Sequence, residues 1–151
     1  MINGKYYKRV FAKPQTYNGI TFKSTLEKDF AVFLDRRNIK WSYENFEFEL
    51  IPQEEWTDKT ELDKSVKTIK RNKKHTLQRV IYTPDFVLPD YNLIVEVKGK
   101  MFDDGLFHLR LRVFKHKYPD VAIWIVRHHS EFENIDNVIE ALKLTRSEVN
   151  A

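Results

Sequence analysis

Residues 82–100 constrain the fold of this chain most, because two short apolar runs there flank a stretch of turn-forming residues. The turn at residues 89–92 reads Pro-Asp-Tyr-Asn and favours a tight reversal of the chain, so the pattern predicts a β-hairpin. Side chains alternate between the two faces of a strand. In the second run one face therefore carries Leu93, Val95 and Val97, and the other carries Ile94, Glu96 and Lys98.

The predicted hairpin brings two acidic side chains together. With the turn centred between Asp90 and Tyr91, Asp85 lies opposite Glu96, with about 5 Å between their Cβ atoms. Two nearby carboxylates repel unless a proton or a cation lies between them, and Mg²⁺ prefers oxygen ligands. A lysine beside such a cation, here Lys98, can stabilise developing charge or help to deprotonate a water molecule. The pattern favours a metal site over the alternative, a surface hairpin with an ordinary salt bridge.

Composition sets the class of protein. A chain of 151 residues corresponds to one domain, and its net charge of +4 is a mild indication of a polyanionic partner. Cysteine is absent, which excludes disulfides and thiolate metal sites and fits a reducing cytoplasm. No stretch has the apolar core of a signal peptide or the length of a membrane span, so we expect no membrane contact.

Residues 1–19 are interpreted as a basic N-terminal arm. Lys5, Lys8 and Arg9 lie there among aromatic residues. This combination suits contact with phosphates and stacking on bases, although a solvated tail fits equally well.

Residues 53–79 form a charged insert that is acidic at first and basic later. A thin apolar stripe predicts a short helix from about residue 58 to residue 71. We favour a DNA-contacting arm over a solvated loop, because long polar segments inside a compact domain are usually functional or disordered. The residues expected to contact DNA are Lys70, Arg71, Lys73 and Lys74.

The first helix is predicted by a capping box, in which Ser24 and Glu27 are three residues apart. Apolar residues at helical spacing follow, and the helix is expected to stop near residues 37–38. Glu27 has two possible roles: it caps its own helix, or it is a further acidic ligand of the site. Residues 39–51 then read as one strand with imperfect alternation, ended by Pro52.

The last third of the chain predicts a helix over residues 106–118, a buried central strand over 121–126 and a closing helix. Arg110 and Lys115 lie off the apolar stripe of the first of these helices, as part of a solvated face or a track for phosphates. The order of elements predicts an α/β fold with a central mixed β-sheet flanked by helices.

These motifs resemble the PD-(D/E)xK nuclease superfamily, whose core is the restriction-endonuclease-like fold. Within it the chain is most similar to the phage endonuclease I family (T-seven type) of Holliday-junction-resolving enzymes. The resemblance covers about residues 20 to 127 with gaps, and the stretches that carry it are 22–27, 38–44, 82–89, 95–99 and 116–126.

The resemblance implies a site with two divalent ions, Mg²⁺ or Mn²⁺. Asp85 would bridge both ions, Glu96 and the backbone carbonyl of Val97 would bind one, and Glu27 would bind the other. Lys98 would assist the attacking water. Two ions clamp the attacking and leaving oxygens in metal-assisted phosphodiester hydrolysis.

The implied function is endonucleolytic cleavage of branched DNA by a homodimer, in the cytoplasm of a phage-infected or prophage-bearing bacterial cell. One rival is a phage nuclease that cuts or nicks ordinary duplex, and another is a DNA-binding protein without catalysis. Two departures from the family stand out. Ser42 replaces a glutamate, for which Glu44 could compensate, and the insert at 53–79 lies where the family has a short link between the halves of a domain-swapped dimer.

Overall fold

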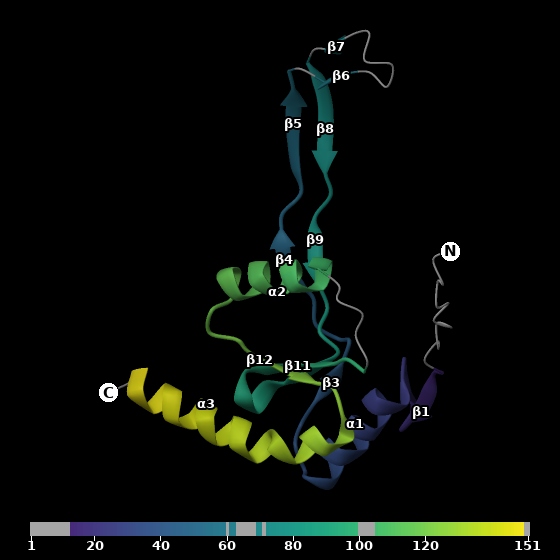
Figure 1. Cartoon of the computed structure of the whole chain (residues 1–151), viewed down its shortest axis with the longest axis vertical. Helices are drawn as coiled ribbons and strands as arrows, with labels where there is room; N and C mark the ends of the chain where they lie inside the picture. The colour runs from purple at the N-terminus through teal and green to yellow at the C-terminus, as the bar shows by residue number, and fades with distance from the viewer. Residues whose placement is uncertain (1–12, 60, 63–68, 71, 100–104, 150–151) are drawn as a thin grey trace, which may run out of the picture.

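The computed structural model describes residues 13–59, 61–62, 69–70, 72–99 and 105–149. Within this part of the chain the fold is mixed α/β, with three α-helices and several small β-sheets (Figure 1). None of the helices in these ranges is long and apolar enough to cross a membrane.

The largest sheet in the described ranges has four strands, in the order β12 (Ala122–Val126), β11 (Leu93–Val97), β10 (Phe86–Leu88) and β3 (Ser42–Tyr43). The strands β10 and β11 are antiparallel, β11 and β12 are parallel, and the sheet is therefore mixed. The short 3₁₀ helix η1 (Pro89–Tyr91) and the left-handed residue Asn92 make the turn between β10 and β11. The predicted hairpin is confirmed, with Phe86 opposite Val95 and Leu88 opposite Leu93.

A small hairpin and a helix precede this sheet. Strands β1 (Gln15–Tyr17) and β2 (Ile20–Phe22) are joined by Asn18 and Gly19, both at positive φ, so the end of the predicted N-terminal arm is part of a folded hairpin. Helix α1 (Thr25–Arg36) begins at the N-cap Ser24, whose Oγ accepts a hydrogen bond from the Glu27 N–H. Its start is where the capping box predicts it.

Helices cover both faces of the sheet. Helix α1, the 3₁₀ helix η2 (His129–Asn134) and helix α3 (Ile135–Val149) pack on one face through side chains such as Phe30, Phe132 and Ile135. Helix α2 (Gly105–Lys117) packs on the other face, where Phe114 meets Ile94 (Figure 1). The face that carries Glu96 is therefore the face covered by α2.

Two strand predictions need correction. The single strand expected over residues 39–51 is wrong: it is divided into β3 and β4 (Phe48–Ile51), and β4 pairs with β9 (Val80–Tyr82) in a different sheet. Glu44 has a φ of 44°, which interrupts the extended backbone between them. The strand over residues 121–126 is not central, because β12 lies at the edge of the described sheet and most of its residues are partly exposed.

The charged insert contains strands rather than a helix over its described residues. Four strands pair in two antiparallel sets to form a projecting arm (Figure 1): β5 (Glu54–Asp58), β6 (Glu61–Leu62), β7 (Ile69–Lys70) and β8 (Lys73–Leu77). The helix predicted from about residue 58 to residue 71 is therefore wrong at the described positions of that range, where β6 and β7 lie. The cross-strand pair Trp56 and His75 supports the β structure of the arm, because the two rings stack with centroids 5.0 Å apart.

Candidate active site

Asp85 and Glu96 lie side by side at one end of the β10–β11 hairpin. Phe86 is opposite Val95, so the next step of the same register places Asp85 opposite Glu96. Both carboxylates are removed from water, with relative exposures of 4% for Asp85 and 2% for Glu96. Buried acidic side chains are rare unless they are paired or bind a cation.

The two carboxylates share one ammonium group. Lys98 Nζ lies 3.1 Å from Glu96 Oε2 and 3.5 Å from Asp85 Oδ2. The backbone N–H of Val97 donates to Asp85 Oδ2 at 2.8 Å, and the Tyr82 hydroxyl donates to Glu96 Oε1. Each carboxylate therefore has one oxygen that faces Lys98 and a fixed orientation within the sheet.

The pKa of Asp85 is raised by its burial and by the excess of negative charge in the site. Burial, followed by the charge of Glu96, raises the pKa of Asp85 from 3.8 to about 7, although Lys98 and the Val97 N–H act in the opposite direction. Burial lowers the pKa of Lys98, but Asp85 and Glu96 outweigh it and leave that pKa above 10.5. Two carboxylates and one ammonium have a net charge of −1 when all are ionised, so a bound divalent cation would relieve their repulsion.

Helix α2 places an aromatic side chain, that of Phe107, near the ammonium group of Lys98. Lys98 Nζ lies 5.6 Å from the centroid of the Phe107 ring, within the range of a cation–π interaction. Phe107 is in the first turn of α2, which places this end of the helix beside the hairpin.

Glu27 lies near the pair but is engaged elsewhere. Its Oε1 accepts a hydrogen bond from Ser24 Oγ at 2.9 Å, and its Oε2 accepts from the Lys23 N–H at 3.0 Å and the Tyr43 hydroxyl at 2.5 Å. It therefore performs the capping role that the sequence allowed. Its charge also contributes to the raised pKa of Asp85.

The arrangement of Asp85 and Glu96 suits a site for one hard divalent cation with two carboxylate ligands, rather than a site with three or more protein ligands. Among the described residues, no group of three or more His, Cys, Asp or Glu side chains is close enough together to hold a metal ion. Mg²⁺ commonly needs only one or two carboxylates, with waters and substrate phosphates completing its coordination. Asp85 and Glu96 meet that requirement. The second ion, the role of Glu27 as its ligand and the role of the Val97 carbonyl stay predictions.

Two tyrosines were not foreseen as part of the site. Tyr82 is buried and holds Glu96, and Tyr43 is half-buried and holds Glu27. Burial is the main cause that raises the pKa of both phenols, so both are hydrogen-bond donors at neutral pH. The only sequence signal was the position of Tyr82 three residues before Asp85. Glu44, the suggested substitute for the missing glutamate, instead forms an ion pair with Lys23.

The described residues among those predicted to bind DNA lie on two elements of the fold, the arm and α2. On the arm, Lys73 and Lys74 are exposed on β8, and Lys70 belongs to β7. On α2, which lies at the base of the arm in Figure 1, Arg110 and Lys115 are exposed. The remaining four residues lie outside the described part of the chain: Lys5, Lys8, Arg9 and Arg71.

Comparison with protein families gives one match, to the family described as "Protein of unknown function (DUF1064)", over residues 5–132. This chain belongs to that family. The match runs from before β1 to η2 and so includes both the candidate active site and the arm. Searches of curated proteins and of solved structures return no match.

Proposed function

We propose that this DUF1064 protein is a metal-dependent DNA endonuclease with a restriction-endonuclease-like core, which hydrolyses phosphodiester bonds in branched DNA. The observation that carries the proposal is the buried pair Asp85 and Glu96, joined by Lys98 at the end of a rigid hairpin. A net negative, buried group of this kind has little structural value by itself, because taking charges out of water costs several kcal/mol per ion. Burial raises the pKa of Asp85, and carboxylates whose pKa is strongly raised in this way cluster at functional sites.

The residues have distinct roles in this proposal. Asp85 and Glu96 would hold Mg²⁺ or Mn²⁺ through their oxygen atoms. When bound, such an ion would polarise the scissile phosphate and lower the pKa of a bound water. Lys98 donates a hydrogen bond to the substrate or to the attacking water, and Phe107 keeps its ammonium group beside the carboxylates.

DNA is the substrate that the charge distribution supports. The exposed basic residues Lys73 and Lys74 on the arm and Arg110 and Lys115 on α2 suit contact with phosphates. A two-stranded β-ribbon also fits the major groove of DNA. The preference for junctions, the homodimer and the cytoplasmic location rest on the resemblance described above. A two-fold dimer would carry two sites to the two related strands of a four-way junction.

A cleavage assay tests the proposal. Wild-type protein is incubated with Mg²⁺ or EDTA and either a four-way junction or a linear duplex built from the same arm sequences. We expect Mg²⁺-dependent cleavage that is faster on the junction, and loss of cleavage in Asp85→Asn, Glu96→Gln and Lys98→Ala. The matched control is Asp90→Asn, an exposed carboxylate in the turn of the same hairpin.

The outcomes separate the candidate functions. Equal rates on junction and duplex would make the protein a general duplex nuclease. DNA binding without cleavage by any metal-loaded form would leave only a binding protein. Near wild-type turnover in Asp85→Asn or Glu96→Gln would remove the site assignment, provided that circular dichroism shows the variants folded.

A further inference from the structure

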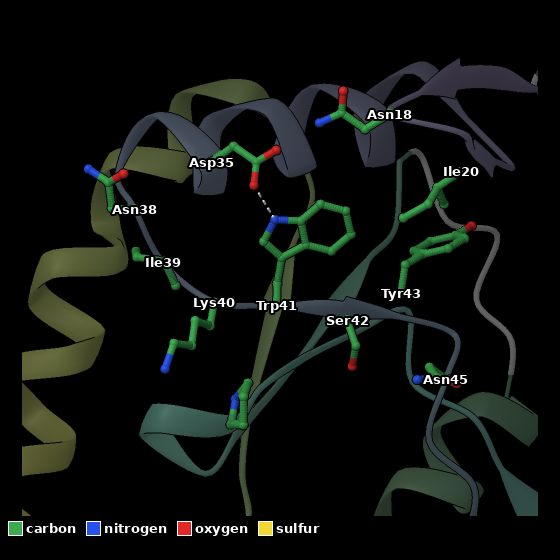
Figure 2. Close-up of a pocket in the computed structure, with 11 residues that line it drawn as sticks. Asn18, Ile20, Asp35, Asn38, Ile39, Lys40, Trp41, Ser42, Tyr43 and Asn45 are labelled. Carbon is green, nitrogen blue, oxygen red and sulfur yellow. Dashed lines mark hydrogen bonds between the residues drawn. The ribbon is translucent and has the colours of Figure 1, made fainter.

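An open depression with a volume of about 940 Å³ lies along the outer edge of the four-stranded sheet. Its floor is the run Ile39–Tyr43, which leads into and includes β3, and its walls come from the turn between β1 and β2 and from the end of α1 (Figure 2). The volume is within the range of small-molecule pockets. The depression is therefore large enough for a nucleoside.

This depression adjoins the candidate active site through β3. Tyr43 lines it, and the hydroxyl of the same residue donates to Glu27. Tyr43 is also the β-ladder partner of Phe86, and the Glu44 N–H donates to the carbonyl of Asp85 at 3.0 Å. Neighbouring strands are about 4.8 Å apart. A ligand in the depression would thus lie one strand away from Asp85.

The lining combines flat apolar surface with amide groups. Trp41 and Tyr43 are half-buried, and their rings also pack against the core residues Phe22 and Phe86, so they line the depression with the part that stays exposed. The side chains of Asn18, Asn38 and Asn45 supply donors and acceptors from three loops (Figure 2). An amide group can match the hydrogen-bonding edge of a base, and aromatic rings stack on bases of any sequence.

The charge in the depression suits the phosphate that accompanies a base. The one carboxylate among the lining residues, that of Asp35, accepts hydrogen bonds from Trp41 Nε1 at 2.7 Å and from the Tyr17 hydroxyl at 2.9 Å. The Lys40 side chain is 78% exposed, and within the described part of the chain its ion pair is a 4.0 Å contact with Asp90. The ammonium group of Lys40 therefore lies at the rim of the depression, while the carboxylate of Asp35 accepts hydrogen bonds from two neutral donors.

We propose that this depression binds the base of an unpaired nucleotide that adjoins the phosphate cleaved at Asp85 and Glu96. The proposal deepens the proposed function and rests on it for the identity of the substrate as DNA. A base inside a duplex stack cannot reach the depression, so only a nucleotide at a branch point, bulge or single-stranded end could enter. The site would select branched or distorted DNA by capturing this base.

Equilibrium binding in EDTA tests the proposal without cleavage. Three DNAs of equal length are compared by fluorescence anisotropy: a fully paired duplex, the same duplex with one unpaired nucleotide, and the same duplex with an abasic residue at that position. A captured base should make the unpaired nucleotide bind about 10-fold more tightly than the abasic residue, since stacking on an aromatic side chain contributes about 1–3 kcal/mol per base. Equal affinities of the wild type for these two DNAs would overturn the proposal.

Two variants locate the effect. Ser42→Leu fills the depression from β3, and Asn45→Ala removes one amide without touching the core. Ser42→Leu should reduce the ratio of affinities to near 1. Asn45→Ala should lower the ratio only in part, because both aromatic rings remain, whereas the control Ser130→Leu, at an exposed position on η2, should keep it. Loss of the ratio in the control, or its retention in both test variants, would contradict the proposal.

The experiments distinguish failure of the base-binding proposal from failure of the nuclease proposal. Base discrimination by a protein that cleaves no DNA would keep this inference and remove the nuclease. Cleavage of DNA by a protein that binds the unpaired nucleotide and the abasic residue equally would keep the nuclease proposal and remove the base-binding proposal. If Ser42→Leu changed only the oligomeric state in sedimentation analysis, the open edge of β3 would be a strand-pairing surface between copies, and the base-binding proposal would be wrong.

Discussion

The hairpin β10–β11 and the hairpin β5–β8 are both antiparallel pairs, but they differ in what surrounds them. Every residue of β11 is buried, and helices cover both of its faces. In β5, by contrast, all residues except Asp58 are exposed, and the hairpin projects from the body of the protein (Figure 1). The same backbone geometry therefore occurs in two different environments, one buried and one exposed.

The two hairpins differ in the interactions that stabilise them. Burial of apolar side chains stabilises β10–β11 strongly enough to keep the carboxylates of Asp85 and Glu96 out of water. Cross-strand pairs such as Trp56 with His75 stabilise β5–β8, and a two-stranded hairpin is only marginally stable in water. A rigid hairpin suits chemistry that needs fixed distances, whereas a weakly held hairpin suits a contact that forms together with its ligand.

The largest contrast should be in catalysis. Glu96→Gln on the buried hairpin should lower the single-turnover cleavage rate by about 1,000-fold, because charge stabilisation by a metal contributes several kcal/mol. Glu55→Gln, the same change at an exposed position of the arm, should leave the rate within about 2-fold. Equal losses in the two variants would show that the hairpins do not differ in this way.

Stability should separate the hairpins next. Val95→Ala removes methyl groups at a position with no exposed surface and should lower the free energy of unfolding by about 2–3 kcal/mol. Thr57→Ala, on the exposed strand β5, should change it by less than about 0.5 kcal/mol. Urea denaturation followed by circular dichroism measures both, and a large loss in Thr57→Ala would mean that the arm belongs to the core.

The hydrogen bonds to Glu96 and Glu27 predict that loss of the Tyr82 hydroxyl and loss of the Tyr43 hydroxyl have different effects on metal affinity. Tyr82→Phe frees Glu96 and should weaken Mn²⁺ binding about 10-fold, the lower end of the effect usual for a residue that orients a metal ligand. Tyr43→Phe frees Glu27, whose oxygens serve the start of α1, and should leave the affinity unchanged. Isothermal titration calorimetry compares them. A loss in Tyr43→Phe would make Glu27 a ligand after all.

The charge buried in β10–β11 predicts a pH-dependent penalty in metal-free protein. The folded pKa of Asp85, about 7, is above its ordinary value of 3.8, so the native state holds the proton more tightly than the unfolded chain. Stability should fall as the pH rises from about 4 to 7. Asp85→Asn removes this penalty, and in EDTA its Tm should exceed that of the wild type by roughly 3 °C or more at pH 8. At pH 4 the two Tm values should agree, and a constant difference at both pH values would exclude this explanation.

The smallest effect should come from the arm. Removing one phosphate-binding lysine reduces the slope of log affinity against log salt by about 0.9, so Lys73→Ala combined with Lys74→Ala should flatten the slope by about 2. Lys143→Ala, an exposed lysine on α3, provides the control and should leave the slope unchanged. An unchanged slope in the double variant would mean that this part of the arm is solvated rather than bound to DNA.

Sequence reasoning succeeded where neighbouring residues decide the structure. The turn at Pro89–Asn92 and the alternation of β11 set the register that places Asp85 opposite Glu96, and Ser24 marks the start of α1. It failed in the arm, where a stripe of three apolar residues suited a helix as well as a strand. It also failed at Glu44, whose positive φ divides one expected strand into two sheets.

By itself, the sequence determined the hairpin, its carboxylate pair and the capped helix, because each depends on contacts between residues close along the chain. Only the tertiary structure decided what holds the carboxylates. Tyr82 meets Glu96 across 14 residues and Tyr43 meets Glu27 across 16, and no local pattern encodes either contact. Such contacts form only when separate strands and helices pack, since packing alone decides which polar groups lose water and must find each other.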